Sequence, residues 1–258
     1  MRPLVLVLVA LAGCAKSPAS ETPSPSLVGE VKQALAEREK RLSSYHLVAD
    51  TTEGGRTAHH EFFFRAPNHG HGVATGGPES VAVAFDGATL YRLDDAEKKV
   101  DAYKLELPPA KAALVLATFF RPFAPDGFRT PLLPSKGVTA KLVSHPMGPQ
   151  AAELTVTTQD EAGGPVEVTY VVRFPSGDFL GKRTRSGMHV GEVKVDTERC
   201  EPALKLCVPT KLTETRDGEV LGTTTITAVE LNPNLPVERF RLEPPEGYTV
   251  QQRVMKEN

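Results

Sequence analysis

Four of the seven histidines lie close together in the sequence, and they are the first candidates for metal chemistry. His59 and His60 are adjacent, while His69 and His71 flank a glycine. If the two pairs lay on neighbouring strands, two imidazoles could meet and hold an ion such as zinc. However, His59 and His60 would point to opposite faces of a strand, and no cysteine lies near them. Surface histidines in a turn-rich region are the simpler interpretation, so we predict no metal site.

Acidic pairs and nucleophile motifs give no better case for catalysis. Asp94–Asp95 and Asp160–Glu161 occur in predicted turn segments, where solvated carboxylates explain them better than acid–base chemistry. The sequence has no G-x-S-x-G elbow, no H-E-x-x-H pair and no phosphate-binding loop. A hydrolase would need a polar cluster within a cleft, and the sequence shows none. We therefore expect a protein that is not an enzyme and that uses no cofactor.

The start of the chain has the build of a secretory signal. Arg2 is a short positive region, and Leu4–Ala12 is an apolar stretch well below the roughly 20 residues that span a bilayer. The tetrapeptide L-A-G-C that ends at Cys14 resembles a bacterial lipobox. That resemblance implies removal of a signal peptide over residues 1–13 and acylation of Cys14. Ala15, where inner-membrane lipoproteins have Asp, implies the outer membrane. A plain secretory signal with a chance cysteine is the alternative.

Fatty chains on Cys14 would hold the protein on a membrane without a transmembrane helix, because each buried methylene contributes roughly 0.8 kcal/mol. Residues 14–25 are rich in Ser, Pro, Ala and Thr, and we expect a disordered tether there. Residues 26–258 would then form the folded domain. The localisation expected from these features is the periplasmic face of the outer membrane.

The two remaining cysteines suit an oxidising compartment. Cys200 and Cys207 enclose six residues, whereas a redox-active pair usually encloses two. With Cys14 acylated they are the only pair left, and in the periplasm we expect them to form a disulfide. On the chain-entropy model, closing so small a loop stabilises the fold by roughly 2.5 kcal/mol.

Composition limits both the size of the fold and its partners. The 258 residues are 24% charged and 40% hydrophobic, which suits one sizeable globular domain. The net charge is −2 and blocks of like charge are absent, so a nucleic-acid partner is not expected.

Alternating apolar residues predict a mainly β, α+β fold built on an antiparallel sheet. Phe62 and Phe64 share one face of a strand, with Phe63 on the other. The same alternation recurs over residues 81–85 and 166–174, and turns rich in glycine separate the runs. We count about ten or eleven strands.

Two segments have helical patterns instead. Residues 26–41 place apolar side chains on one face, and Ser26 is a favourable N-cap. Pro108–Phe123 starts at its prolines and is apolar nearly all round, with Lys111 and Arg121 as its only charges. A helix without a polar face must be buried on more than one side, or must cover something that comes and goes. It is therefore either a core helix or a lid over an apolar cavity.

Several segments resemble the outer-membrane lipoprotein-carrier superfamily, the LolA/LolB-like proteins. F-D-G-A-T-L-Y-R-L-D-D (85–95) resembles the D-G hairpin of that superfamily, and residues 235–250 resemble its closing F-x-x-x-P-P-x-G-Y segment. Residues 60–74 and 207–232 resemble further pieces in the same order. Members fold as an incomplete, strongly curved antiparallel β-barrel whose open side is plugged by helices, and their apolar concavity holds acyl chains. Residues 124–148 have no recognisable counterpart.

The resemblance and the apolar helix together predict a lipid-anchored periplasmic protein that holds acyl chains of a lipoprotein or lipid in an apolar cavity. It would act in outer-membrane lipoprotein or lipid transport, and the acylation signal makes it more like receptor or sensor members than like the soluble carrier. The alternative is an envelope sensor or protein-interaction module with a filled core, which meets partners through a sheet edge or loop. The side chains predicted to line the cavity are Phe62, Phe64, Val81, Val83, Phe85, Leu114, Phe119 and Phe120.

Overall fold

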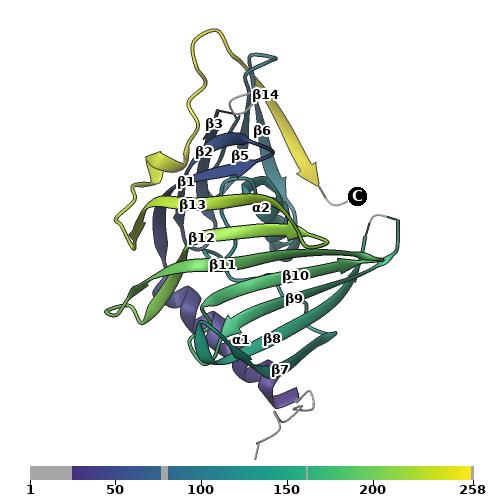
Figure 1. The fold of residues 1–258 in the computed structure, drawn as a ribbon. Coiled ribbons are helices and arrows are strands. Elements are labelled where there is room, and N and C mark those ends of the chain that lie inside the picture. Colours follow the sequence, from purple (N-terminus) through teal and green to yellow (C-terminus); the bar gives the residue numbers. More distant parts are fainter. Residues whose placement is uncertain (1–24, 77–80, 161, 257–258) are drawn as a thin grey trace, which may run out of the picture.

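One continuous sheet of fourteen strands forms the body of the protein (Figure 1). The structure, a computed structural model, describes residues 25–76, 81–160 and 162–256. The expected signal peptide, Cys14 and all but the last residue of the expected tether lie outside the described residues. The elements, in chain order, are α1 (Pro25–Arg41), β1 (Ser44–Glu53), β2 (Arg56–Arg65), β3 (His69–Thr75), β4 (Val81–Phe85), β5 (Thr89–Asp94), β6 (Lys99–Glu106), α2 (Pro109–Phe120), β7 (Val138–His145), β8 (Gly148–Gln159), β9 (Pro165–Arg173), β10 (Phe179–Ser186), β11 (His189–Glu201), β12 (Leu206–Arg216), β13 (Glu219–Leu231), the 3₁₀ helix η1 (Val237–Phe240) and β14 (Thr249–Lys256).

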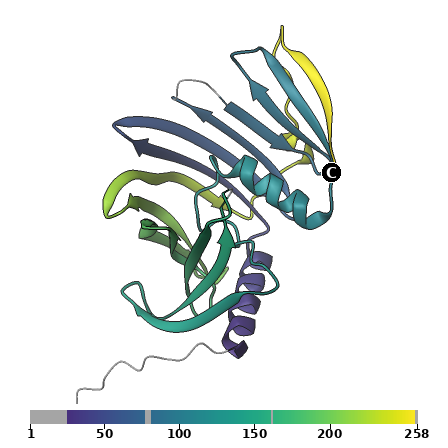
Figure 2. The ribbon, with the colours of Figure 1, turned by 90° about the vertical axis from the view of Figure 1, so that its right-hand side faces the viewer.

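The sheet consists of two antiparallel meanders that meet in its middle. Strands β1–β6 form the first and β7–β13 the second, and β1 pairs with β13 where they join. The sheet bends strongly, with α2 inside the curve, and its two edge strands β7 and β14 stay apart (Figure 2). Register shifts at Val48/Ala49 in β1 and at Val195/Thr197 in β11 add local bends of the kind that β-bulges produce. The predicted fold class, a strongly curved incomplete barrel, is therefore confirmed.

The expected strand count and strand directions need correction. Fourteen strands are present rather than ten or eleven, and β14 runs parallel to β6. Strand β3 lacks the alternation of apolar and polar residues that predicts a strand, because Gly70 and Gly72 occupy two of its inward positions. Strands β7 and β8 begin in or near the 124–148 segment, which resembles nothing familiar.

The main core lies between α2 and the concave face of the sheet. Leu116 and Phe120 of α2 are buried there, and the helix ends three residues before the predicted Phe123. Phe120 lies directly over Gly70 of β3, so that a Cβ on this glycine would be 2.7 Å from the ring. Glycine in a strand interior allows such a close approach. Gly70 and Gly72 of β3, here called the glycine seat, therefore leave room for the aromatic side chains of α2 and of the residues after it.

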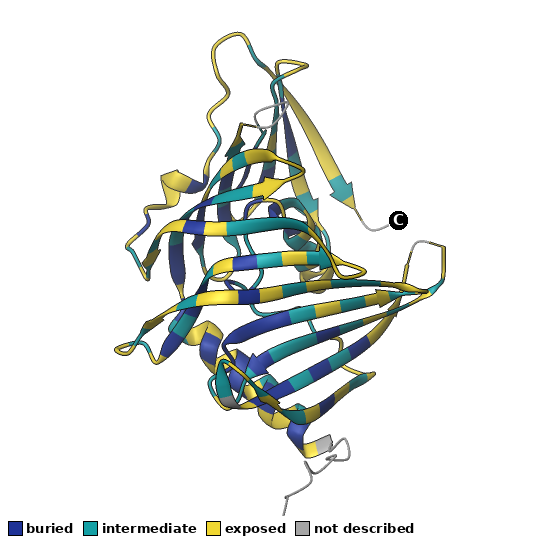
Figure 3. Cartoon of the chain, viewed as in Figure 1, coloured by how far each residue is buried: buried dark blue, intermediate teal, exposed yellow. Residues whose placement is uncertain are grey.

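Helix α1 covers the second meander and forms a smaller core. Its Val31 and Leu35 pack with Leu154 and Val172 on β8 and β9, where buried and exposed residues alternate along the strands (Figure 3). The helix begins at Pro25, so the expected N-cap Ser26 already lies within its first turn. Proline suits that first position because its missing N–H has no intrahelical partner there. In the part of the chain that the structure describes, no helix combines the length and the apolar character needed to cross a membrane.

The convex face is also covered in part, which the alternation pattern did not predict. Phe63, expected on the wet face of β2, is buried with Leu235 and Phe240 from the segment after β13. The ring of His46 stacks on Phe63 with centroids 4.2 Å apart, and the guanidinium of Arg239 lies 4.4 Å from the ring centre. The C-terminal segment thus crosses the outside of the first meander before it pairs as β14.

We predict that Gly70→Ala destabilises the protein by about 1–3 kcal/mol, because the new methyl group overlaps the Phe120 ring and forces a shift in a packed core. Urea unfolding followed by circular dichroism measures the change. Gly191→Ala on β11 is the matched control, since its Cβ meets nothing closer than 3.9 Å. Equal stability of the two variants would contradict the proposed seat.

Candidate functional site

The residues predicted to line an acyl-chain cavity fall almost entirely within the main core. Five are buried in one cluster and two pack against its edge, whereas Leu114 is 60% exposed on the outer side of α2. The buried ones are Phe62, Phe64, Val83, Phe85 and Phe120, and the two at the edge are Val81 and Phe119. The side chains are thus gathered beneath α2, where they pack against the helix.

An open space lies beside this core. A cleft of about 590 Å³, here called the main cleft, opens between the residues that follow α2 and strands β1, β2 and β10–β13. None of the eight predicted residues is among those that line it. Its walls carry hydroxyl and charged groups, including Thr184, Glu192, Glu214 and Arg216. The sequence reasoning missed this cleft because its walls come from strands that are polar on the concave face.

The floor of the main cleft is apolar and belongs to the core. Ala49, Phe123 and Leu212 line the cleft and are also members of the buried cluster beneath α2. His60 contributes a wall from β2, and burial is the main cause that lowers its pKa. The cleft therefore has an apolar floor that continues into the core, with a polar rim above it.

The connector from Arg121 to Gly137 joins α2 to β7 and forms one side of the main cleft. Asp126 in this connector makes an ion pair with Lys182 of β10, on another wall of the cleft. One residue on, the carbonyl of Gly127 accepts a hydrogen bond of 2.5 Å from the buried guanidinium of Arg38 on α1. The connector is therefore held by polar contacts six and seven residues after the end of α2.

A second, smaller cleft of about 140 Å³, here called the small cleft, is lined by later residues of the connector, from Phe128 to Leu132. Phe64 of β2 and Phe128 of the connector form its apolar wall, and Arg38 and Arg129 bring positive charge to it. The main cleft reaches β2 at His60, so the fully buried Phe62 lies between the two clefts on that strand. The apolar core thus extends from one cleft to the other.

The four neighbouring histidines do not come together. Strands β2 and β3 are adjacent, but His59 and His60 pair with Thr75 and Ala74, at the far end from His69 and His71. His59 instead bonds Asp50, at 2.6 Å between Nδ1 and Oδ1.

Carboxylates of the two acidic pairs accept hydrogen bonds within turns. The Asp94 carboxylate accepts the Glu97 N–H, and the Asp160 carboxylate accepts the Gly164 N–H. Asp95 accepts the hydroxyl of Tyr248 at 2.7 Å. Glu161 lies outside the described residues.

Cys200 and Cys207 form the predicted disulfide, across paired positions of β11 and β12. In the described residues, the group of potential metal ligands that lie together consists of these two cysteines and Glu198. Because the disulfide uses both sulfur atoms, this arrangement is structural rather than metal-binding.

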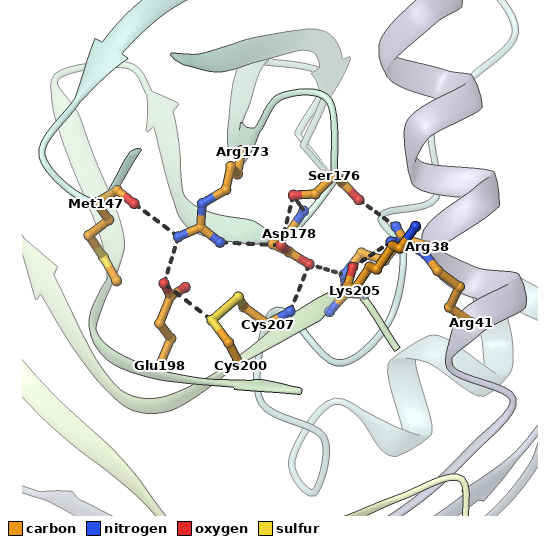
Figure 4. The surroundings of a disulfide bond; sticks show 10 residues. All are labelled: Arg38, Arg41, Met147, Arg173, Ser176, Asp178, Glu198, Cys200, Lys205 and Cys207. Carbon is orange, nitrogen blue, oxygen red and sulfur yellow. Dashed lines mark hydrogen bonds and ion pairs between the residues drawn. A yellow bond between two sulfur atoms is a disulfide. The ribbon is translucent and has the colours of Figure 1, made fainter. Parts of the chain in front are cut away.

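A buried ionic network lies beside the disulfide (Figure 4). Asp178 accepts the Cys207 N–H at 3.1 Å and pairs with Arg38 at 3.5 Å and Arg173 at 3.2 Å. The side chains of Arg38 and Asp178 are each only 3% exposed. Burial lowers the pKa of Arg38, and the Asp178 carboxylate acts in the opposite direction. One carboxylate therefore links α1, the disulfide hairpin and, through Arg38, the connector.

Comparison with protein-family models and with curated proteins gives no match. Solved structures with a similar fold include a DUF1329 family protein from Desulfovibrio piger, with a TM-score of 0.50 and 11% identity over 82% of this chain and 97% of that one. A LolA superfamily protein from Nitrosomonas europaea gives a TM-score of 0.51 and 10% identity over 82% and 97%. A domain assigned to outer-membrane lipoprotein sorting from Vibrio parahaemolyticus gives 0.50 and 9% over 81% and 94%.

The protein has a LolA-like fold. At these identities the similarity concerns the architecture of the chain, and the LolA-like half-barrel is the frame that holds both clefts. Within that frame lie the polar rim of the main cleft, the two arginines of the small cleft and the ionic network at the disulfide.

We predict that Asp178→Asn lowers the free energy of unfolding by about 3–5 kcal/mol, because it leaves the buried Arg38 without a counter-charge. Glu37→Gln is the control, since its ion pair with Lys40 is solvent-exposed and such pairs contribute little. Chemical denaturation of both variants measures the difference. A small and equal effect of the two changes would show that the network does not anchor the LolA-like scaffold.

Proposed function

We propose that this protein is a lipid-anchored binding protein of the bacterial envelope, which holds the acyl chain of a lipoprotein or lipid beneath α2 and its connector. The observation that carries the proposal is the continuity of the main cleft with the apolar core through Ala49, Phe123 and Leu212. An amphiphile entering the cleft would meet a polar rim first and then an apolar floor. A role in outer-membrane lipoprotein or lipid transport follows from that binding.

Hydrophobic transfer would drive the binding. The side chains of Phe120 and Phe123 now fill the space above the glycine seat of β3. Movement of α2 and the connector would replace these phenyl groups with methylenes of the ligand. Burying about ten methylenes contributes roughly 8 kcal/mol, which is enough to hold a chain without covalent chemistry. Because Leu114 already faces solvent, α2 is covered on one side only and is suited to act as a lid.

The anchor is part of the same proposal. The lipobox-like L-A-G-C sequence supports acylation of Cys14, and the Ser- and Pro-rich residues that follow suit a flexible tether. With the folded part held close to a membrane, a bound chain would move only a short distance between the bilayer and the cleft.

A bulky side chain in the main cleft should block the ligand. We predict that Thr184→Trp weakens binding of a fluorescent fatty acid at least tenfold, because the indole fills the cleft between β10 and β11. Arg185→Trp is the matched control, since neighbouring residues of a strand point to opposite faces and Arg185 is exposed.

The measurement is displacement of the fluorescent fatty acid by decanoate, with full chains that also carry Cys14→Ser. Lipid extraction and mass spectrometry of the same preparations identify any chain that is carried through purification. Absence of binding by the chain with Thr184 intact, in both assays, would overturn the proposed function.

The anchor has its own test in a diderm bacterial host. We predict that Cys14→Ser abolishes labelling by radioactive palmitate and releases the protein from the membrane fraction, because the acyl chains are its only expected attachment. Cys200→Ser with Cys207→Ser is the control and should remain labelled and membrane-bound. Retention of Cys14→Ser in the washed outer-membrane fraction would contradict anchoring by acylation.

One observation favours a second candidate, a protein-interaction module on the same fold. Strand β14 forms an edge of the sheet and is exposed along nearly its whole length, with Val250 and Val254 each about half exposed. An uncovered edge strand presents unpaired backbone groups to which a partner strand can add. A chain that binds no fatty acid but retains a partner through β14 would establish this alternative.

A further inference from the structure

The small cleft is surrounded by buried polar atoms that lack partners. Within the described residues, the hydroxyls of Tyr45 and Thr130 have no hydrogen-bond partner. Thr130 lines the small cleft, whereas Tyr45 lies directly behind its wall. Buried polar groups are almost always hydrogen-bonded, so two unpaired hydroxyls around one cleft need an explanation.

Tyr45 is the more informative of the two. Its side chain is fully buried, and its ring stacks on Phe64 at 5.1 Å and on Phe128 at 5.3 Å between centroids. Both of these rings form the apolar wall of the small cleft. Phenylalanine would fill the same space without leaving a hydroxyl unpaired, and an unpaired buried hydroxyl destabilises a fold. The hydroxyl therefore suits a role in which it donates a hydrogen bond to a ligand group that enters the small cleft.

The charges around the Tyr45 hydroxyl indicate which kind of chemical group it would bind. Arg38 and Arg129 both line the cleft, and the Arg129 guanidinium lies 5.2 Å from the centre of the Phe64 ring. Among the described residues, no carboxylate forms an ion pair with Arg129. Burial raises the pKa of Tyr45, so the phenol stays neutral and keeps its proton to donate. Glu39, the one acidic side chain that lines the cleft, is exposed.

We propose that the small cleft, with Tyr45, Arg129 and Thr130 as donors, binds the anionic oxygen group of an amphiphile whose chain lies in the apolar core. This inference rests on the proposed function and adds the polar end of its ligand. The shared chemistry is a carboxylate or a phosphate, since both accept several hydrogen bonds and pair with guanidinium. A volume of about 140 Å³ suits such a small group rather than a whole ligand.

The path of the chain follows from the position of the two clefts. Phe62 lies between them on β2 and is fully buried, so a chain that starts at the small cleft passes beneath α2 toward the main cleft. Ala113 of α2 lines the small cleft, and Phe123 after α2 lines the main one. One movement of α2 and its connector would therefore open the site for the anionic group and the space for the chain together.

The test compares three probes of equal chain length by isothermal titration calorimetry: decanoate, decyl phosphate and decanol. The full chain with Cys14→Ser should bind at least one of the two anions roughly tenfold more tightly than decanol, as expected for a hydrogen bond to a charged group. The tighter of the two anions identifies carboxylate or phosphate as the natural group.

Variants place that preference at the small cleft. Tyr45→Phe and Arg129→Gln should each remove most of the preference for the anion and leave decanol affinity unchanged. Arg121→Gln, which removes a cation from the main cleft, is the matched control and should keep the preference. Tyr45→Phe should also unfold at the same or a higher urea concentration than the parent, because it removes an unpaired buried hydroxyl. This stability readout separates loss of a donor from loss of the fold.

Three outcomes would overturn the inference. Equal affinity for decanol and both anions would remove it and leave the proposed function intact. A preference for anions that survives in Tyr45→Phe and Arg129→Gln would place the anionic group elsewhere. The unpaired Tyr45 hydroxyl would then have no role in binding. Failure of all three probes to bind would overturn both the inference and the proposed function.

Discussion

The structure depends on the burial of a helix that has no charged face. Helix α2 carries apolar side chains on most of its surface, and it can remain folded in water only if a sheet curves around it. Phe120 meets that requirement at Gly70, where the absence of a Cβ lets the far end of the ring approach β3 closely. The curvature that brings β10–β13 around the other side leaves space next to this contact. The main cleft is therefore a consequence of how the sheet closes over α2.

On the opposite side of the molecule, a buried set of charges adds to the apolar packing of α1. Asp178 contacts α1 through Arg38, the disulfide hairpin through the Cys207 N–H, and strand β9 through Arg173. Breaking one member of such a buried set leaves an uncompensated charge, so the set acts as a unit. The second meander thereby has both an apolar core and an ionic network that it shares with α1. The first meander supports α2 mainly through apolar contacts, which can be replaced by a ligand of similar chemistry.

Local sequence patterns predicted the parts of the fold that depend on a single strand or a single helix. Alternation placed Phe62, Phe64, Val83 and Phe85 on one buried face, and the apolar run after Pro108 predicted α2. The same reasoning placed Phe63 in water, because a strand pattern carries no information about Leu235 and Phe240, which cover it. The main cleft was missed for a similar reason. Its walls come from six strands and a connector that are brought together by curvature and register, neither of which has a local signal.

Two departures from good packing lie around the same helix. Leu114 faces solvent on the outer side of α2, and Tyr45 keeps an unpaired hydroxyl within the core beneath it. Each could be removed by a small substitution, and the unpaired hydroxyl is unfavourable in a protein that only has to stay folded. Both are reasonable if α2 leaves its seat during function, because Leu114 would then meet a partner or membrane while Tyr45 meets a ligand. The polar rim and apolar floor of the main cleft fit the same cycle, in which an amphiphile takes the place of aromatic side chains.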